Sequence, residues 1–495
     1  MADMSRPEGR APIPTPQGGS AKPSCVGLAG GSPAAVSAGA SYRFLCGLLC
    51  LSLNVLAGCT EGSPNVVLIT VDTLRTDHMS AYGYERETTP NIGALFSRSV
   101  VFTEAITPRP KTTPSLASLL TGRYPHGHGV RTLYQPLAPG NRTLPGVLQE
   151  SGYATAAFVS NFVLVREFSG LDAGFDLYDD FVTERELNRD VFHRKAEATV
   201  SQVLGWLDGR DDERPFFLWV HFIDPHGPYQ PPEPYGELFR GPPGPQVPLP
   251  MIPEYQRLPG ITEAQRYFDL YDGEIRYTDA QIGRLLEGLG GDDFLDDNIV
   301  VFSTDHGESL GEHAYFFEHG EYLYDQCSRV ALSIAGPGFD AAQVDRQVSN
   351  IDLLPTLLSR LGLPVPDGID GRDLTGTIRG GESPSRRTFI EHANKYKAIR
   401  TREWKLILHR DLEGRVLGRE LYHLESDPAE TRNIAPHQAE RVAELEPQLL
   451  EWMALDPDPD LYEGVVPTDA RNYGPRFRVP NAEEIEKLRS LGYVE

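Results

Sequence analysis

Three apolar runs constrain the fold of this chain more than any other feature. They read VVLITV at 66–71, FFLWVHFI at 216–223 and IVVFST at 299–304. Nearly continuous apolar runs of this length are typical of strands that are buried on both faces of a parallel sheet. Helical patterns lie between them, at 90–98, 142–151, 189–208 and 262–289. This alternation predicts an α/β fold with a doubly wound sheet that is sandwiched by helices.

The residue that follows each run is an acid. Asp72 follows the first run, Asp224 follows the second, and Asp305 with His306 follows the third. In an open α/β sheet, ligands bind beside the carboxyl ends of the strands. We therefore expect Asp72, Asp305 and His306 to meet at one edge of the sheet. Carboxylate oxygens with an imidazole are suitable ligands for a divalent cation.

The segment KTTPSLASLLTG, residues 111–122, predicts a helix that starts beside two hydroxyls. Pro114 suits the first helical position and Gly122 suits the C-terminal end. Thr112 or Thr113 then suits the cap. A hydroxyl there lies among unpaired N–H groups and the positive end of the helix dipole, which favour an anion. On this segment alone, an ordinary helix cap explains the threonines as well as an anion site does.

Composition and the N-terminal pattern narrow the class of protein. The net charge of −24 over 495 residues argues against a nucleic-acid partner. An apolar run after Arg43 ends in Leu-Ala-Gly-Cys at 56–59, which resembles a bacterial lipobox. We therefore predict lipidation at Cys59 and an exported protein that is lipid-anchored to the bacterial cell envelope, on the periplasmic or outer-membrane side. A plain signal peptide and an uncleaved anchor are the alternatives.

Three regions are predicted along the chain. Residues 1–58 are read as a disordered extension plus a signal peptide with the lipobox. Residues 62–385 carry the α/β pattern and the candidate site. Residues 386–495 change to short strands with turns, followed by helical patterns at 436–454 and 482–491. This last region predicts a smaller C-terminal α+β subdomain.

Four sequence blocks resemble one known family in their content and order. They are NVVLITVDTLRTDHMSAYGY at 65–84, TTPSLASLLTGRYPHGHGV at 112–130, FFLWVHFIDPHGPY at 216–229 and VVFSTDHGESLGEH at 300–313. With them the chain resembles the sulfatase family, within the alkaline-phosphatase-like superfamily. The resemblance implies a mixed or parallel sheet between helices, a smaller C-terminal subdomain, and hydrolysis of sulfuric or phosphoric esters.

The resemblance also implies roles for individual residues. Asp72, Asp305 and His306 match the family's metal ligands, and the metal is one divalent ion, Ca or Mn, Zn or Mg. Thr112 falls at the position of the nucleophile, whose oxygen also contacts the metal. A metal-bound hydroxyl has a lowered pKa, so the chemistry agrees with these roles.

Two histidines outside this set are expected to face the substrate. His226 matches a histidine that protonates the leaving group or holds the ester oxygen, and His319 lies where many relatives carry a substrate-binding lysine. Asn161 is a candidate neutral donor to the substrate. Asp224 with His226 could help to build a second metal site. His221 lies within an apolar run, and we expect it to be a core histidine whose hydrogen bonds are satisfied.

The chain also departs from the family's pattern. Most members carry Cys or Ser at position 112, which is converted to formylglycine, and threonine cannot follow that route. Leu116 replaces the motif's arginine, and Thr73 replaces the second Asp of the usual pair. A threonyl sulfate lacks the easy elimination of formylglycine sulfate, which favours phosphate or phosphonate esters.

Two interpretations stay open at this point. The first is a hydrolase with a threonine nucleophile, similar to phosphodiesterases, phosphonate hydrolases and phosphoethanolamine transferases. The second is a degenerate, non-catalytic binding protein. Retention of the four candidate metal-site residues favours the enzyme, because unpaired buried charges are costly to keep. The expected partner is an anionic ester, such as a glycan or a lipid head group.

Overall fold

The computed structural model describes residues 62–381, 386–392, 395–411 and 413–456. All of them belong to one compact unit, Gly58–Glu495. The predicted extension, the lipobox with Cys59 and the helix at 482–491 lie outside the described residues, so they stay predictions. Among the described helices, none is both long and apolar enough to cross a membrane.

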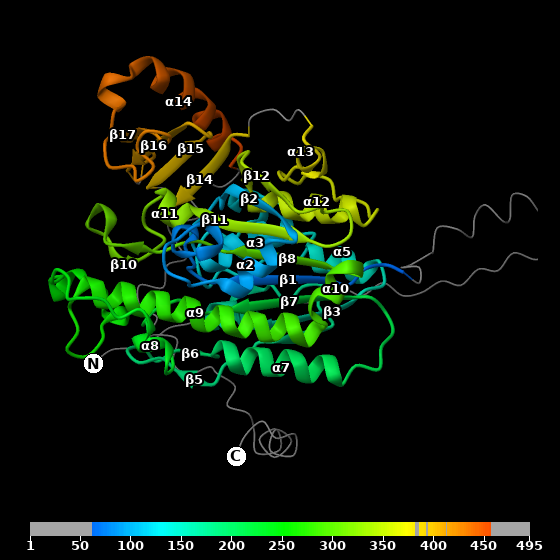
Figure 1. Cartoon of the computed structure of the whole chain (residues 1–495). Helices are drawn as coiled ribbons and strands as arrows, with labels where there is room; N and C mark the ends of the chain where they lie inside the picture. Colours follow the sequence, from blue (N-terminus) through cyan, green and yellow to red (C-terminus); the bar gives the residue numbers. More distant parts are fainter. Residues whose placement is uncertain (1–61, 382–385, 393–394, 412, 457–495) are drawn as a thin grey trace, which may run out of the picture. The chain divides into compact units, whose positions relative to one another are not determined.

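The described residues form a nine-stranded mixed sheet that confirms the predicted fold class (Figure 1). The order is β12-β2-β11-β8-β1-β7-β3-β4, and β13 pairs with β2. The strands are β1 (Val66–Val71), β2 (Ser99–Ile106), β3 (Ala154–Val159), β4 (Leu177–Asp179), β7 (Phe216–Phe222), β8 (Ile299–Thr304), β11 (Arg329–Ala335), β12 (Ala342–Val344) and β13 (Val348–Ser349).

The three apolar runs are adjacent strands at the centre of this sheet. β1 lies between β7 and β8 and is parallel to both. Val71 is in register with Phe222 on one side and Thr304 on the other. β11 runs antiparallel to β8, which makes the sheet mixed. Because the three strands end together, the residues that follow them emerge at one edge.

Helices cover both faces of the sheet, and alternate strand residues point to opposite faces. Leu68 and Trp219 pack on one face with α3 (Thr112–Thr121), α5 (Leu144–Glu150) and α12 (Leu353–Arg360). Ile69 and Val220 pack on the other face with α2 (Pro90–Phe96), α7 (Ala196–Asp208), α9 (Ala264–Leu289) and α10 (Gly291–Asp297). The shorter helices are α4 (Pro125–His128), α6 (Arg166–Ser169), α8 (Tyr235–Leu238), α11 (Asp325–Ser328) and α13 (Thr375–Ile378).

One predicted helix starts later than its sequence pattern indicates. We expected a helix over 189–208, but α7 begins only at Ala196. The preceding residues form β6 (Phe192–His193), which pairs with β5 (Glu184–Arg185) as a small hairpin. Asp224, at the end of β7, accepts a hydrogen bond from the first amide of α7 at 2.9 Å. This hairpin forms one wall of the cavity that is described below.

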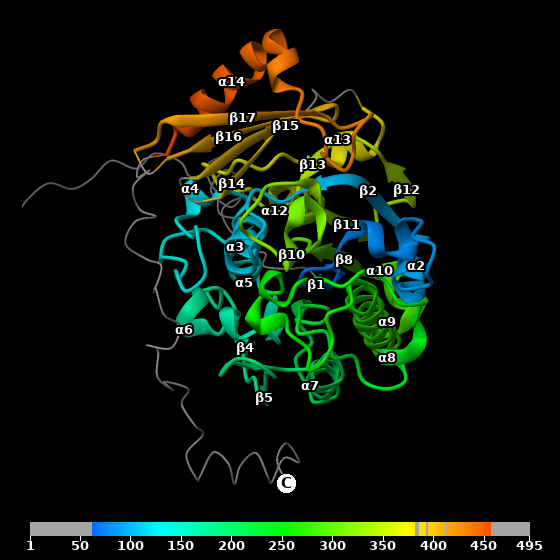
Figure 2. The ribbon, with the colours of Figure 1, turned by 90° about the vertical axis from the view of Figure 1, so that its left-hand side faces the viewer.

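The predicted C-terminal subdomain is a four-stranded antiparallel sheet within the described residues, with one face covered by a helix (Figure 2). Its elements are β14 (Thr388–His392), β15 (Tyr396–Arg400), β16 (Trp404–Arg410), β17 (Val416–His423) and α14 (Ala439–Met453). Leu406 and Leu421 pack against α14. On the opposite face, Ile407 packs against Ile106 and Leu323 of the larger sheet domain.

Buried ion pairs join the two sheets. Asp325, in α11, contacts Arg400 of β15 at 2.6 Å and Lys405 of β16 at 2.7 Å. Arg400 also contacts Glu104 of β2 at 2.8 Å, and Lys405 contacts Glu430 at 2.8 Å. Burial opposes the charge of Asp325, but Arg400 and Lys405 outweigh it and hold its pKa far below the usual value. We call these five residues the junction cluster.

Candidate functional site

The two candidate carboxylates meet at the carboxyl edge of the central strands. Asp72 follows β1, and its amide donates to the carbonyl of Phe222 at 2.9 Å. Asp305 follows β8, and its amide donates to the carbonyl of Val71 at 3.2 Å. The parallel ladder therefore continues through both residues and fixes their side chains, which are fully buried. The structure brings Asp72, Asp305 and His306 together, as the sequence pattern predicts.

Helix α3 brings Thr112 to the same edge, but Thr112 is not the helix cap. The helix begins at Thr112, with Lys111 at the cap position and no hydrogen bond from the side chain of Lys111 to the helix. Thr112 Oγ1 lies 3.3 Å from His306 Nε2 instead. Ser115 Oγ donates to the carbonyl of Asp305 at 2.6 Å, which ties α3 to β8. The expected cap is wrong because this hydroxyl is used between elements.

The C-terminal end of α3 follows the sequence prediction. Gly122 ends the helix with a φ of 67°, in the left-handed region that favours glycine. Its amide donates to the carbonyl of Ser118 at 2.9 Å. Both ends of α3 are thus set by local contacts, and the position of Thr112 is fixed.

Several buried polar atoms at this edge have no hydrogen-bond partner among the described residues. They include Asp72 Oδ1, Asp305 Oδ2 and His221 Nε2. One ligand atom from each of these residues lies within 4.8 Å of the other two. Unpaired buried polar atoms are costly unless something satisfies them. The donor set of two carboxylates and an imidazole therefore fits a divalent cation.

His306 adds a further donor to this set. Its Nδ1 lies 2.9 Å from the carbonyl oxygen of Gly307, so that nitrogen carries the proton. The lone pair on Nε2 is then free to bind a metal. This atom lies 3.7 Å from Asp72 Oδ1 and 3.5 Å from Asp305 Oδ2. Thr112 Oγ1 and one oxygen of each carboxylate thus lie within 3.7 Å of His306 Nε2.

The electrostatics of the site are dominated by burial and by like charges. Burial, and then the charge of Asp72, raise the pKa of Asp305 well above its usual value. Burial also opposes the ionisation of Asp72, but neighbouring histidines outweigh it and hold the pKa at about 2. Burial lowers the pKa of His306 to about 4, so the ring is neutral at pH 7. The ionised carboxylate of Asp72 and the neutral ring of His306 are therefore both ready to bind a cation.

His221 corrects one of the sequence-based expectations. It is fully buried in β7, but Nε2 is not satisfied and lies 3.7 Å from Asp72 Oδ2. Its Nδ1 lies 2.9 Å from Thr70 Oγ1, which also accepts a hydrogen bond from Trp219 Nε1 at 2.9 Å. His221 therefore lies beside the carboxylates with a buried nitrogen that is not satisfied, and this contradicts the expected core histidine. Strand alternation gave a signal, because His221 shares its parity with Trp219 and so faces α3.

Asn161 and Thr73 hold the two carboxylates. Asn161 Nδ2 donates to Asp72 Oδ2 at 2.6 Å, so part of the amide that we expected to bind substrate holds a candidate ligand. Thr73 stands where most relatives carry a second Asp, and its backbone amide donates to Asp305 Oδ1 at 3.2 Å. Its φ of 52° is strained for a β-branched residue. Tyr271 stabilises this turn by donating to the carbonyl of Thr73 at 2.7 Å.

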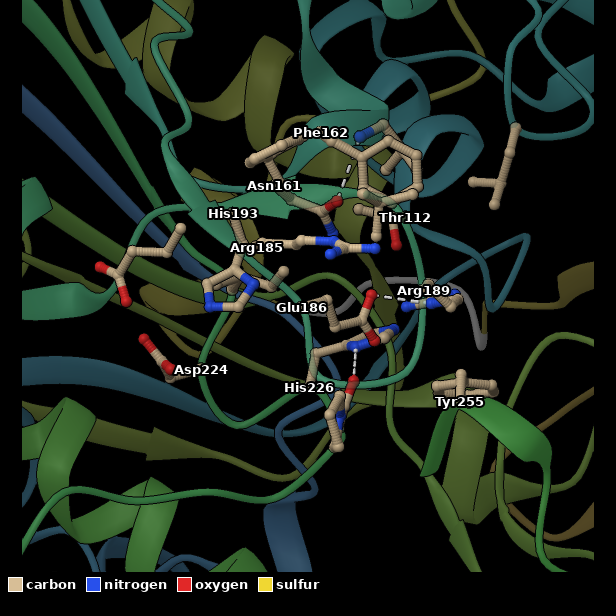
Figure 3. A pocket seen from close by; sticks show the side chains of 18 of the residues that line it. Thr112, Asn161, Phe162, Arg185, Glu186, Arg189, His193, Asp224, His226 and Tyr255 are labelled. Carbon is tan, nitrogen blue, oxygen red and sulfur yellow. Dashed lines mark hydrogen bonds and ion pairs between the residues drawn. The ribbon is translucent and has the colours of Figure 1, made fainter. Parts of the chain in front are cut away.

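A cavity of about 290 Å³ opens beside Thr112 and contains the other predicted site residues (Figure 3). Asn161, His226 and His319 line it together with Thr112. His226 Nδ1 lies 2.7 Å from the carbonyl oxygen of Gly227, which leaves the Nε2 lone pair free in the neutral ring. Burial lowers the pKa of His226 to about 4 and that of His319 well below its usual value.

Neighbouring side chains hold these two histidines in place. His319 Nδ1 lies 3.0 Å from Glu308 Oε1, and its ring centroid is 4.6 Å from that of His306. His226 stacks on Tyr255 with ring centroids 5.8 Å apart. Sequence reasoning missed both Glu308 and Tyr255. The spacing of Glu308 after His306 gave only a weak signal, and the contact with Tyr255 depends on a loop distant in sequence.

Asp224 lies at the cavity but belongs to another set of contacts. Its Oδ2 accepts from the amide of Ala196, and its Oδ1 lies 3.6 Å from Lys195 Nζ. Lys195 also lies 3.7 Å from Glu274. Asp224 is thus engaged with α7 and Lys195, and a second metal site with His226 stays a prediction.

Comparisons with known proteins identify the family of this chain. The sulfatase family model matches residues 64–363, and the model "N-sulphoglucosamine sulphohydrolase, C-terminal" matches residues 311–454. An N-acetylglucosamine-6-O-sulfatase from Bacteroides thetaiotaomicron is 26% identical over 83% of this chain and 92% of its own length. A choline-sulfatase from Rhizobium meliloti is 27% identical over 76% of this chain and 83% of its own length.

Solved structures share the fold. A protein solved in complex with its substrate, D-glucosamine-2-N,6-O-disulfate, has a TM-score of 0.68 and 22% identity over 80% of this chain and 99% of that one. The phosphonate monoester hydrolase of Agrobacterium radiobacter has a TM-score of 0.66 and 24% identity over 79% and 96%. The family match spans more than half of the chain and includes every candidate site residue described above. The chain therefore belongs to the sulfatase family and is a sulfatase-like ester hydrolase.

Proposed function

We propose that this chain is a metal-dependent hydrolase of sulfuric or phosphoric (phosphonic) esters that uses Thr112, as encoded, as its nucleophile. One observation carries the proposal: Thr112 Oγ1 starts a helix beside His306 and the paired carboxylates, and it lines the cavity. A helix N-terminus supplies N–H groups that stabilise the negative charge of an attacked ester. An ordinary structural threonine needs neither the cavity nor the unpaired carboxylate atoms beside it.

Asp72, Thr112, Asp305 and His306 would hold the cation, with His221 as a further donor. A divalent cation in this place lowers the pKa of a coordinated hydroxyl and screens the charge of an anionic ester. The family's sulfatases act with a formylglycine, which no threonine can provide. The proposal therefore includes no formylglycine.

The protein's own residues account for the proton transfers. Thr112 Oγ1 attacks the sulfur or phosphorus in line, and its proton passes to a neutral imidazole, His226 or His319. The same imidazole then protonates the departing alcohol as the ester bond breaks. Water next attacks the sulfur or phosphorus of the Thr112 ester and gives up a proton to the imidazole. The Thr112 oxygen recovers a proton from it as the inorganic acid leaves.

Phosphorus esters are the better substrates in this proposal. Formylglycine sulfate can eliminate sulfate through its second hydroxyl, whereas a threonyl sulfate requires attack by water on sulfur. The likeness to a phosphonate monoester hydrolase shows a shared fold and is compatible with this preference. An acceptor alcohol in place of water would make the chain a phosphoethanolamine-type transferase, and this is the alternative within the same chemistry.

The decisive experiment uses the soluble domain from residue 62. The protein is stripped of metal, loaded with Ca, Mg, Mn or Zn, and assayed on aryl sulfate, aryl phosphate, bis-aryl phosphate and aryl phosphonate. We expect turnover that needs a metal and is lost in Thr112→Ala. Turnover that survives in Thr112→Ala would exclude Thr112 as the nucleophile. Tight metal binding without turnover of any ester would favour the binding-protein alternative.

We also propose that the protein is exported and anchored to the cell envelope through lipidated Cys59. Support comes from the Leu-Ala-Gly-Cys pattern at the end of the apolar run. The natural substrate would then be extracytoplasmic, such as a glycan or a lipid head group. Membrane fractionation of cells that express wild type or Cys59→Ala tests this, and we expect only the wild type to sediment with membranes. Equal sedimentation of both would contradict the anchor.

A further inference from the structure

Lys111 is a cation beside the nucleophile that the proposed mechanism has not used. It lies at the cap position of α3, next to Thr112, and it lines the cavity. Among the described residues its amine makes no hydrogen bond or ion pair. Its charge acts on the rings of the site histidines. Lys111 thus lines the cavity in which an attacked ester would lie, next to Thr112.

The other cations that line the cavity are paired within the described part of the chain. Arg189 contacts Glu186 at 2.8 Å, and Arg185 contacts Asp190 at 3.2 Å. Lys195 is paired with Asp224 and Glu274, as described above. Their charges are neutralised by neighbouring carboxylates, whereas Lys111 has no carboxylate at ion-pair distance. An unpaired ammonium in a cavity is costly unless an anion joins it.

Two carboxylates act on Lys111 from a distance, and both are engaged elsewhere. Glu318 accepts a hydrogen bond from the hydroxyl of Tyr255 at 3.2 Å. Glu308 contacts His319 Nδ1 at 3.0 Å. Each carboxylate therefore already contacts another residue that lines the cavity. Neither carboxylate is paired with Lys111, so the ammonium is available to bind an anionic ligand.

The backbone at Gly320 makes room for the Lys111 side chain. Gly320 has a φ of 89°, and a Cβ at this position would lie 2.6 Å from Lys111 Cδ and 3.1 Å from Nζ. The carbonyl of Gly320 is held by Arg109 Nη1 at 2.9 Å. Any other residue here would push the lysine stem away from its present path. This is an independent sign that the stem has a fixed place along the cavity wall.

We infer that the Lys111 ammonium binds an ionised, non-bridging oxygen of the group that Thr112 attacks. The substrates are then esters whose transferred group carries a negative charge, and neutral esters are excluded as a class. This inference rests on the proposed function.

The test measures oxyanion binding by the metal-loaded protein, with inorganic phosphate and inorganic sulfate as probes. Calorimetry compares wild type with Lys111→Met, Lys111→Arg and the control Arg142→Met. Arg142→Met removes the same charge, but Arg142 is exposed, is paired with Glu150 at 2.6 Å and does not line the cavity. We expect Lys111→Met to weaken binding about 10- to 100-fold, Lys111→Arg to weaken it less, and Arg142→Met to leave it within about twofold.

Unchanged binding in Lys111→Met would overturn the inference. Equal weakening in Arg142→Met would overturn it too, because the effect would then come from net charge alone. Metal content and thermal unfolding are measured on each variant, and Lys111→Arg must retain both. Turnover that does not respond to Lys111→Met would refute the inference and leave the proposed function intact. Lys111-dependent binding without turnover of any ester would refute the proposed function alone.

Discussion

The candidate site and the junction cluster are both buried groups of charge, and they differ in how completely their members are paired. In the junction cluster, Asp325 lies between Arg400 and Lys405 at ion-pair distance. In the site, Asp72 and Asp305 present unpaired oxygens to each other. A paired buried cluster holds elements together, whereas an unpaired one costs stability until a ligand arrives. The paired charges thus stabilise the folded structure, whereas the unpaired charges are available to bind a ligand.

The largest expected effect is the loss of activity when Thr112 of the candidate site is replaced. Thr112→Ala should lower kcat by about 10⁴-fold or more, because it removes the attacking oxygen. It should change the free energy of unfolding by only about 1 kcal/mol. Initial rates on aryl phosphate and urea denaturation measure the two quantities. Thr112→Ser is the control and should keep measurable turnover; a serine variant as inactive as the alanine variant would argue against a hydroxyl nucleophile.

The paired cluster should give the largest effect on stability. Asp325→Asn leaves Arg400 and Lys405 without their carboxylate and should lower the free energy of unfolding by about 3–5 kcal/mol. Metal affinity should stay unchanged. Asp411→Asn is the control, because its pair with Arg415 at 2.6 Å involves an exposed arginine and should contribute less than about 1 kcal/mol. Similar losses in both variants, in urea denaturation, would remove the distinction between the two clusters.

In contrast to Asp325→Asn, replacing a carboxyl group of the candidate site by an amide should raise the free energy of unfolding. Asp305→Asn should raise the free energy of unfolding of the metal-free protein by about 1 kcal/mol, because it replaces a carboxyl group whose ionised form is disfavoured by burial and by Asp72. The same variant should lose the stabilisation by added metal, about 2.7 kcal/mol at 100 times Kd in the wild type. Thermal unfolding with and without metal measures both. If the metal-free variant is less stable than the metal-free wild type, the Asp305 carboxyl group is not buried at a cost to stability.

Acid should weaken the junction cluster more than it weakens exposed ion pairs. The folded pKa of Asp325 lies below its unfolded value of about 4. Its stabilisation is therefore complete above the unfolded pKa and is lost as the pH falls toward the folded pKa, by about 1.4 kcal/mol per pH unit for one proton. Urea midpoints of wild type and Asp325→Asn should converge from pH 5 to pH 3. A constant difference would mean that Asp325 does not titrate as expected.

The smallest expected effect is on metal affinity, when the hydrogen bond from Asn161 to Asp72 is removed. Asn161→Ala removes the hydrogen bond to Asp72 Oδ2 and should weaken metal affinity about tenfold, with little change in unfolding. Competition with a chelator of known affinity measures it. Asn141→Ala makes the same change away from the site and should leave metal affinity unchanged. If the two variants behave alike, Asn161 does not orient Asp72 and its predicted contact with substrate becomes the better explanation.

Much of the fold could be predicted from the sequence because the signals are local. The runs at 66–71, 216–223 and 299–304 are apolar over their whole length, so burial on both faces follows from composition alone. The acids after them follow the general rule for strand ends. The start of α7 could not be predicted, because the pairing of β5 with β6 depends on contacts across a loop.

Site residues that follow a strand or start a helix could be predicted from the sequence. Residues whose role depends on which face of the sheet they lie on were harder to predict. Asp72, Thr112, Asp305 and His306 come together as their positions indicate. His221 was misjudged because its role depends on which face of β7 carries α3. Lys111 was visible in the sequence, but its importance lies in the absence of a partner, and only the folded arrangement shows which charges are left unpaired.

The contact between Trp219 and Thr70 has an optical consequence. The indole N–H is held by the hydroxyl that also contacts His221, within the core and away from solvent. A change at His221 Nε2, such as binding of a cation, alters the polarity along this short chain of hydrogen bonds and so alters the emission of the indole. The chain has four tryptophans, and Trp219 is fully buried next to the site. We therefore expect the fluorescence of Trp219 to report filling of the site, with no attached dye.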